Sequence, residues 1–235
     1  MGWHWHGKTH LTCDLLSPWR HQFGTRWGGS DFPTLRNYRL RQIHSGVVLL
    51  ATEAPDPPRG DGLITTEPGQ GVWVCSADCV PVLIGCVKTG QVAALHAGWR
   101  GTAARILPTA IQKMLAQGSD LTSLRVALGP AISGANYQVQ MEVVTALAAT
   151  VTTPTCPTVE AVIATWQTQP ELLRPDGQRW RLDLRYVQRH QLLQLGLAPE
   201  QIDIAPCCTY ADAQHFYSYR RDKQTQVQWS GIASK

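Results

Sequence analysis

The chain has 235 residues, of which 43% are hydrophobic and 16% are charged. This composition excludes a disordered chain, because it supplies ample apolar surface for a packed core. The net charge of +4 is small and the basic residues are scattered, which excludes a dedicated nucleic-acid-binding protein. The length suits one large domain or two small ones. Because no internal repeat divides the chain, we expect a single domain over residues 1–235.

The N-terminal residues contain no apolar stretch long enough for a signal peptide, and no window approaches the roughly 18 apolar residues of a membrane span. We therefore expect a cytoplasmic protein without membrane contact. The seven cysteines have no repeating spacing and are interpreted as reduced thiols, some of which could bind metal or act as nucleophiles. We discount His4, His6 and His10 as metal ligands, because frayed termini rarely build defined sites.

The first elements along the chain are a loop and a set of short apolar strands. Prolines and glycines over 54–62 predict a loop. Apolar runs over 71–75, 80–87 and 91–95 predict buried strands, the last two of which form a hairpin. Residues 102–117 have helical periodicity, although Pro108 is expected to kink or split that helix.

The second half of the chain continues with a strand over 124–128 and a helix over 139–149. A break over 152–157 follows, and Asp183 is the expected N-cap of a helix that stops at Gly196. Residues 201–205 predict a final short strand. Because strands and helices alternate imperfectly and hairpins are mixed in, we expect an α/β or α+β layered fold with mixed sheets.

The expected hairpin places Cys79 and His96 at the same end of adjacent strands. A thiol beside an imidazole is either a nucleophile with its base or a pair of metal ligands. The structural alternative is a buried cysteine and a hydrogen-bonded core histidine. The nearby Asp78, Trp99 and Arg100 favour a functional site, because burying such groups without a role is costly.

Further candidates lie at the ends of other predicted elements. His44 precedes an apolar run over 47–50, so it lies at a strand end, where site residues gather in α/β proteins. Asp61 is flanked by glycines, and its local sequence favours a simple turn. Near the C-terminus, aromatic residues accompany Arg220 and Arg221, which could bind phosphate or form a solvated pair.

Several motifs can be compared with a known family by their order and spacing. They are Gln42-Ile-His-Ser, Gly60-Asp-Gly-Leu-Ile-Thr, Ser76-Ala-Asp-Cys-Val-Pro-Val-Leu, Leu95-His-Ala-Gly-Trp-Arg-Gly-Thr, Leu128-Gly-Pro-Ala-Ile, Tyr137-Gln-Val, Leu182-Asp-Leu, Cys208-Thr and Phe216-Tyr-Ser-Tyr-Arg-Arg-Asp. Across roughly residues 18–222 the chain resembles the YfiH family. That family is also labelled the multicopper polyphenol oxidase or laccase-domain family, and some of its members are called peptidoglycan editing factors.

The resemblance implies a single-domain, layered α/β/β/α fold, similar to that of bacterial toxin deamidases with a Cys/His hydrolase site. It also implies a catalytic zinc site formed by His44, Cys79 and His96. Family members are described as purine nucleoside phosphorylases that split adenosine, inosine or methylthioadenosine with phosphate, and as adenosine deaminases. The implied partners are a small-molecule nucleoside and phosphate. The resemblance does not decide between a monomer and a homodimer.

The resemblance and the chemistry together assign roles to the polar residues. Arg100 and Arg220 are our candidates for binding phosphate. Asp61, grouped with them as substrate-binding, or Asp78 would serve in acid–base work or orient the metal ligands. A multicopper oxidase needs many histidine ligands, and beyond His44 and His96 only His215 could converge, so we expect zinc, with copper as the alternative.

Two other functions compete with the zinc phosphorylase. One is a Cys79/His96 thiol hydrolase that edits an amide in a cell-wall precursor, a UDP-muramoyl amino acid, in which metal would inhibit. The other is a non-catalytic protein that stores metal or binds a partner. The chain also departs from the family: Ser45 replaces a glycine, the segment 31–41 is short, and Lys223 replaces the glycine after Arg-Arg-Asp. These changes make the substrate preference uncertain and leave the three metal ligands intact.

Overall fold

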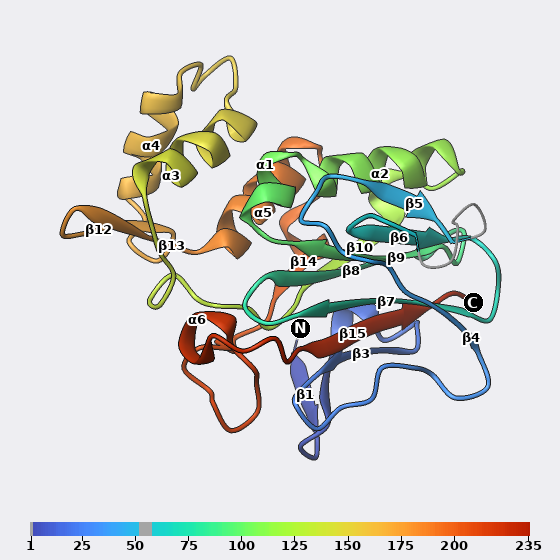
Figure 1. Cartoon of the computed structure of the whole chain (residues 1–235). Coiled ribbons are helices and arrows are strands. Elements are labelled where there is room, and N and C mark those ends of the chain that lie inside the picture. Colours follow the sequence, from blue (N-terminus) through green and yellow to red (C-terminus); the bar gives the residue numbers. More distant parts are fainter. Residues whose placement is uncertain (1, 52–57) are drawn as a thin grey trace.

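Two six-stranded sheets lie face to face in the computed structural model, which describes residues 2–51 and 58–235 (Figure 1). The first sheet has the spatial order β1 (Trp3–His6), β2 (His10–Cys13), β3 (His21–Gly24), β15 (Gln228–Ala233), β7 (Gln70–Ser76) and β4 (Arg36–Tyr38). The second has the order β14 (Ile202–Ile204), β10 (Leu124–Leu128), β8 (Val80–Cys86), β9 (Val92–Ala97), β6 (Gly62–Thr65) and β5 (Val48–Leu50). Both are mixed, because β4, β5 and β14 each run parallel to their neighbours.

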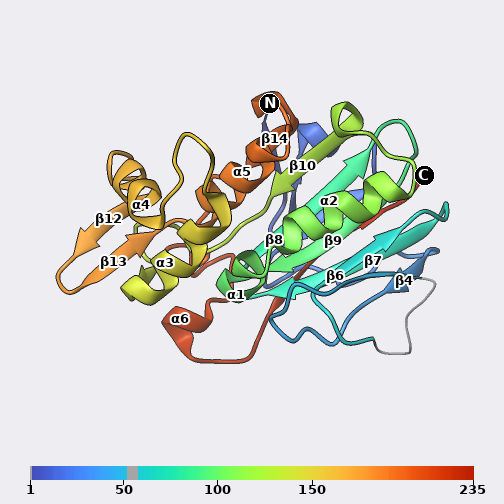
Figure 2. The same ribbon diagram turned by 90° about the horizontal axis from the view of Figure 1, so that it is seen from above.

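Helices cover the outer face of the second sheet, as Figure 2 shows from above. They are α1 (Trp99–Ala103), α2 (Ile106–Ala116) and α5 (Leu184–Gln194). At one end lie α3 (Met141–Ala148), α4 (Val159–Gln167) and a small sheet of β11 (Gln138–Val139), β13 (Arg179–Leu182) and β12 (Leu173–Asp176). The remaining pieces are α6 (Tyr219–Asp222) and the 3-10 turns Asp14–Leu16, Leu121–Ser123, Ala149–Val151 and Pro199–Gln201.

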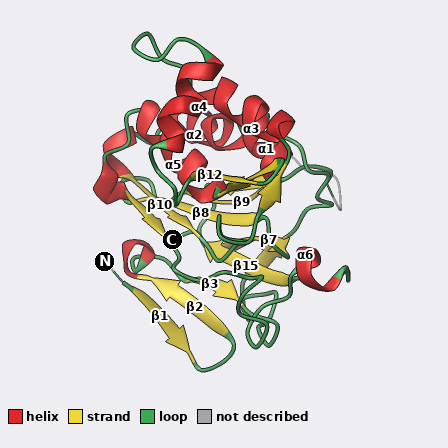
Figure 3. Ribbon diagram, turned by 90° about the vertical axis from the view of Figure 1, so that its left-hand side faces the viewer, coloured by secondary structure: helices red, strands yellow, loops and turns green. Residues whose placement is uncertain are grey.

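The second sheet is buried on both faces, which explains its continuous apolar runs. Along β8, Val82 and Ile84 pack toward the helices, whereas Leu83 packs toward the first sheet. Successive side chains of a strand point to opposite faces, so a strand between two packed layers must be apolar at every position. The mixed α/β class expected from the sequence is confirmed, and Figure 3 shows helices on one side of the stacked sheets.

The opposite outer face, that of the first sheet, is covered differently. Phe32 packs there against Trp73 and Ala233, with Leu35 beside them. Within the described residues an irregular segment of the chain thus lies where the α/β/β/α resemblance implied a second helical layer. This segment belongs to the stretch 31–41 that is short in this sequence.

The expected hairpin of residues 80–95 is confirmed, since β8 and β9 are antiparallel neighbours. The strand over 124–128 is confirmed as β10, and Asp183 caps α5 by accepting from the backbone N–H of Arg185. The expected loop over 54–62 falls partly on residues 52–57, which lie outside the described residues.

Two helix predictions need correction. The helix expected over 102–117 is split, which is one of the two outcomes expected, but at Arg105, whose φ of 58° is left-handed, and its first part, α1, begins at Trp99. The split precedes Pro108, which therefore lies in the first turn of α2, where its missing N–H forfeits no helical bond. The helix expected from 139 begins at Met141, because β11 pairs with β13 instead.

The N-terminal histidines are not frayed, contrary to the expectation from the sequence. Residues His4 and His6 belong to β1 and His10 to β2, and the rings of His6 and His10 stack with centroids 4.6 Å apart. Regular structure extends on both sides of the 18–222 range, since β15 lies in the interior of the first sheet. None of the helices among the described residues combines the length and apolarity needed to cross a membrane.

Candidate metal centre

Three potential metal ligands meet at one end of the second sheet. Cys79 directly precedes β8 and His96 lies near the end of β9, and the pairing of Pro81 with His96 brings the two side chains to the same edge. His44 precedes β5 at the other side of the sheet. One donor atom from each of His44, Cys79 and His96 lies within 4.8 Å of the others. The register of the hairpin therefore brings Cys79 and His96 close together, although they are 17 positions apart in the sequence.

Asp61 is the carboxylate that orders this cluster. It is fully buried, and its Oδ1 atom lies 2.9 Å from His96 Nδ1 and accepts from the backbone N–H of His44 at 2.9 Å. Its Oδ2 atom accepts from the backbone N–H and the hydroxyl of Ser45, at 2.6 and 2.7 Å. A carboxylate on one imidazole nitrogen orients the ring and leaves Nε2 for a ligand. Asp61 was expected to bind substrate or orient ligands, and its position here suits orientation.

The backbone at His44 has a left-handed φ of 58°, which is uncommon for a residue with a side chain. Such conformations persist where surrounding contacts hold them, and here the bonds to Asp61 supply those contacts. The His44 ring stands edge-on to that of His96, with centroids 4.9 Å apart. His44 is exposed whereas His96 is buried, so the cluster opens to solvent on the His44 side.

Glycines leave the space that the cluster needs. A Cβ at Gly98 would lie 2.7 Å from Cys79 Sγ, and one at Gly101 would lie 2.9 Å from the carbonyl oxygen of Ser45. Distances below 3.0 Å force a rearrangement. The His-Ala-Gly-Trp-Arg-Gly segment therefore needs glycine at both positions so that α1 can begin directly beside the thiol.

Electrostatics in the metal-free protein favour a thiolate beside an imidazolium. Burial disfavours the charged form of Cys79, but hydrogen bonds from His44 and His96 outweigh it and lower the thiol pKa to about 7. Burial likewise opposes the charge on His96, but Asp61 and Cys79 raise its pKa to about 9. Two imidazole nitrogens and one thiolate form a donor set typical of a three-ligand zinc site, so the residues present fit such a metal.

Asp78, the residue before Cys79, connects the cluster with the C-terminal segment that carries Arg220. Asp78, with φ of 93°, accepts from the Thr209 hydroxyl and from the backbone N–H of Arg220, both at 2.7 Å. The guanidinium of Arg220 donates to the carbonyl of Gln138 and lies 5.1 Å from the ring centroid of Tyr137. Arg220 is half-buried, and no carboxylate of the described residues forms an ion pair with it.

The other residues singled out by sequence have separate places. Arg100 is exposed and its guanidinium lies over the Trp99 ring. Arg221 bonds three backbone carbonyls and Asp222, so it is structural. His215 pairs with Asp212 and does not join the cluster. Tyr137, which belongs to the Tyr137-Gln-Val motif, lies beside Arg220, a contact that no local sequence pattern predicts.

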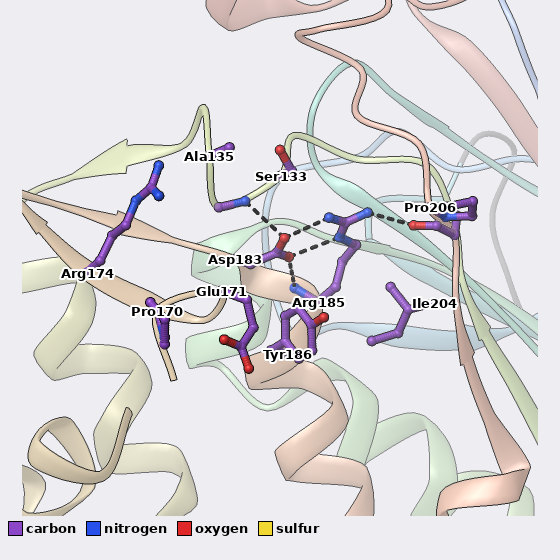
Figure 4. A pocket seen from close by; sticks show the side chains of 12 residues that line it. Ser133, Ala135, Pro170, Glu171, Arg174, Asp183, Arg185, Tyr186, Ile204 and Pro206 are labelled. Atoms are coloured by element: carbon purple, nitrogen blue, oxygen red, sulfur yellow. Dashed lines mark hydrogen bonds and ion pairs between the residues drawn. The ribbon is translucent and has the colours of Figure 1, made fainter. Parts of the chain in front are cut away.

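A cavity of about 370 Å³ lies elsewhere, and its lining includes none of the three ligands. Figure 4 shows at its floor the buried ion pair of Asp183 and Arg185, in which Arg185 Nη2 lies 2.6 Å from Asp183 Oδ2. Asp183 also accepts from the backbone N–H of Gly134. The two buried charges are thus paired with each other. The cavity lies between the start of α5 and the loop that carries Tyr137.

A family model described as multi-copper polyphenol oxidoreductase laccase matches residues 28–235. The chain belongs to this family. Among curated members it is 45% identical to a purine nucleoside phosphorylase of Synechocystis sp., over 99% of this chain and 97% of that protein. It is 34% identical to a purine nucleoside phosphorylase of Deinococcus radiodurans, over 83% of this chain and 68% of that protein.

Two solved structures have the same fold as this chain. The chain is similar to the hypothetical protein YfiH of Bacillus licheniformis, with a TM-score of 0.82 at 23% identity and coverage of 99% of both chains. It is equally similar to YlmD of Geobacillus stearothermophilus, with a TM-score of 0.82 at 24% identity, over 99% of this chain and 98% of that chain. The resemblance to the YfiH family inferred from the motifs is confirmed.

Proposed function

We propose that this chain is a zinc-dependent purine nucleoside phosphorylase that cleaves adenosine, inosine or methylthioadenosine with phosphate. The observation that carries the proposal is the cluster of His44, Cys79 and His96. The backbone of Arg220 is bonded to Asp78, the residue before Cys79, and Arg220 is a half-buried cation without a carboxylate partner among the described residues. The name shared by the Synechocystis and Deinococcus relatives supports the reaction class.

The residues present fit zinc better than a set of coppers. His44, Cys79 and His96 would hold the ion, which when bound would supply a Lewis acid next to the substrate. Copper oxidase chemistry, to which the family's name refers, needs several metal sites with many histidines. Among residues 2–51 and 58–235 this is the one group of three such side chains close enough to bind an ion.

The chain's own residues would bring the two substrates together. The Arg220 guanidinium would bind phosphate, and the exposed Arg100 could add a second positive charge at the mouth. A phosphate oxygen would then attack C1′ of the ribose while the bond from C1′ to the purine nitrogen breaks. Asp61 would keep the imidazole of His96 oriented throughout, because its carboxylate is fully buried and bonded.

A second candidate function rests on the same cluster without metal. Cys79, His96 and Asp61 form a chain of thiol, imidazole and carboxylate, the arrangement by which cysteine hydrolases activate their nucleophile. In this function Cys79 would attack an amide carbonyl, and bound metal would block the thiolate. Adenosine deamination, by contrast, would use the same metal-loaded site as phosphorolysis.

Product analysis tests the phosphorylase proposal. Zinc-loaded protein is incubated with adenosine, inosine or methylthioadenosine, with and without phosphate, beside the Cys79→Ala variant. We expect free base and the corresponding ribose 1-phosphate from wild-type protein only when phosphate is present, and none from the variant. Inosine formed from adenosine without phosphate would indicate deamination. Absence of turnover with all three nucleosides would overturn the proposal.

A chelator separates the two candidate mechanisms. Removal of metal should abolish nucleoside cleavage, and readdition of zinc should restore it. If the thiol hydrolase is correct, chelation should instead raise activity toward amide substrates. Alkylation of the metal-free protein should then abolish that amide activity, because the thiolate is the nucleophile.

A further inference from the structure

Tyr137 lies against the candidate phosphate-binding residue. It follows a loop that leaves β10 and directly precedes β11, and its ring is half-buried. The Arg220 guanidinium lies over this ring, 5.1 Å from the centroid. The same guanidinium donates to the carbonyl of Gln138 at 2.9 Å, so two successive residues hold the Arg220 head group in place. Tyr137 and Arg220 thus form one structural unit.

The loop before Tyr137 is anchored at several points. The backbone N–H of Ile132 donates to the carbonyl of Asp78 at 3.1 Å, and that of Gly134 donates to Asp183 at 2.9 Å. The carbonyl of Tyr137 accepts from the backbone N–H of Leu182. Asp78 also accepts from the backbone N–H of Arg220. The residue next to the thiol ligand therefore sets the positions of both the Tyr137 loop and the arginine.

The hydroxyl of Tyr137 is close enough to Cys79, Arg220 and Arg100 for their charges to affect its pKa. Its pKa is raised to about 12, first by burial and next by the negative charge of Cys79, while Arg220 and Arg100 act in the opposite direction. No hydrogen bond within the described part of the protein uses this hydroxyl. A half-buried hydroxyl that stays protonated and has no protein partner is a donor available to a ligand.

We infer that Tyr137 binds phosphate together with Arg220: the guanidinium supplies the charge and the tyrosine hydroxyl donates a hydrogen bond to a phosphate oxygen. This inference rests on the proposed phosphorolysis for its biological meaning. Its ligand is the inorganic phosphate dianion, which accepts several hydrogen bonds and is bound most strongly where a donor lies beside a fixed cation. No covalent step is assigned to Tyr137.

The Tyr137→Phe variant isolates the hydroxyl, because phenylalanine retains the ring that contacts Arg220. The matched control is Tyr219→Phe, since Tyr219 adjoins Arg220 in sequence but is exposed, with Lys223 over its ring. Because the variant loses a hydrogen bond to a charged group, we expect Tyr137→Phe to bind phosphate roughly tenfold more weakly than wild type. The KM for nucleoside and the zinc content should stay within twofold, which a general structural defect would not allow.

The test is a calorimetric titration of zinc-loaded protein with inorganic phosphate, repeated as phosphate KM in the turnover assay. We expect wild type and Tyr219→Phe to bind phosphate alike and Tyr137→Phe to bind it about tenfold more weakly. Equal phosphate binding in all three proteins, or no binding by wild type, would overturn the inference. Phosphate binding by wild type without nucleoside cleavage would instead overturn the proposed function, and the Tyr137→Phe titration would still decide the inference.

Discussion

The three candidate metal ligands are each held in place by a different local contact. His44 is held by a left-handed backbone bonded to Asp61, His96 by the carboxylate on its Nδ1, and Cys79 by the close approach of Gly98. None of the three depends on a long, flexible side chain. Such preorganisation keeps ligand atoms close together before any metal binds, which lowers the conformational cost of binding.

The thiols of the metal-free protein should differ in their reactivity toward iodoacetamide. Cys79 has a pKa of about 7, whereas burial raises that of Cys75 to about 11. Only the thiolate reacts, and a lowered pKa means that the thiolate is present above pH 7 and lost below it. We expect labelling of Cys79 to rise through about pH 7 and that of Cys75 to stay low up to pH 9, as measured by peptide mass spectrometry. Added zinc should protect Cys79.

Equal labelling of the two cysteines at pH 8 in chelated protein would contradict this prediction. The Cys79→Ala variant serves as the control, because the fast phase should disappear while labelling of Cys75 is unchanged. A Cys79 that stays reactive after zinc is added would show that it is not a ligand.

At the scale of residues, the sequence predicts a site of His44, Cys79 and His96, and the structure brings these three side chains together. The hairpin predicted from two apolar runs sufficed to bring Cys79 to His96. The local sequence of Asp61 indicates only a turn, and its expected role came from the family resemblance, because its bonds to Ser45 and His96 join separate segments of the chain. Tyr137 carried no signal of its own, since its role depends on Arg220, 83 positions away.

At the scale of elements, buried glutamines of α5 bind the turn that leads from β9 to α1. The amide of Gln188 donates to the carbonyl of Ala97 at 2.8 Å and to the hydroxyl of Thr102 at 2.9 Å. Gln191, one turn later, donates to the carbonyl of Thr102. Because Ala97 follows His96, these bonds connect the packing of α5 with the position of a candidate metal ligand.

Replacing Gln188 with leucine should destabilise the protein. The carbonyl of Ala97 and the hydroxyl of Thr102 would lose a buried partner, and each unsatisfied group costs roughly 1–3 kcal/mol. We expect a loss of at least about 2 kcal/mol in the free energy of unfolding, measured by urea denaturation. The control is Gln194→Leu: Gln194 is exposed and makes a single bond, to the carbonyl of Val151, so its replacement should change stability less. Equal stability of the two variants would contradict the prediction.

Elements with a strong local pattern were predicted, and those stabilised by distant partners were not. β8, β9 and β10 have continuous apolar runs because both faces are buried. β15 contains Gln228, Ser230 and Gly231 and gives no such run, although it pairs with β3 and β7. The tertiary pairing makes it a strand, and a single sequence does not reveal that pairing.

At the scale of the whole molecule, the first sheet combines both ends of the described chain. β15 lies between β3 and β7, whereas β1 lies at an edge. Truncation after Val227 would therefore open two interior edges, and deletion of residues 1–8 would remove only an edge strand. We expect the first variant to be insoluble or unfolded by circular dichroism and the second to retain the native spectrum. A folded, soluble protein ending at Val227 would contradict this.

The position of β15 also affects the order in which the protein can assemble during synthesis. All strands of the second sheet, and the three metal ligands with them, precede β15 in the chain. During synthesis the second sheet and the candidate metal ligands can therefore form while the facing edges of β3 and β7 are still unpaired. Long-range pairing of this kind is slow, and open edges invite association between nascent chains. Cellular yield of this protein should therefore depend more on its C-terminal strand than on its metal supply.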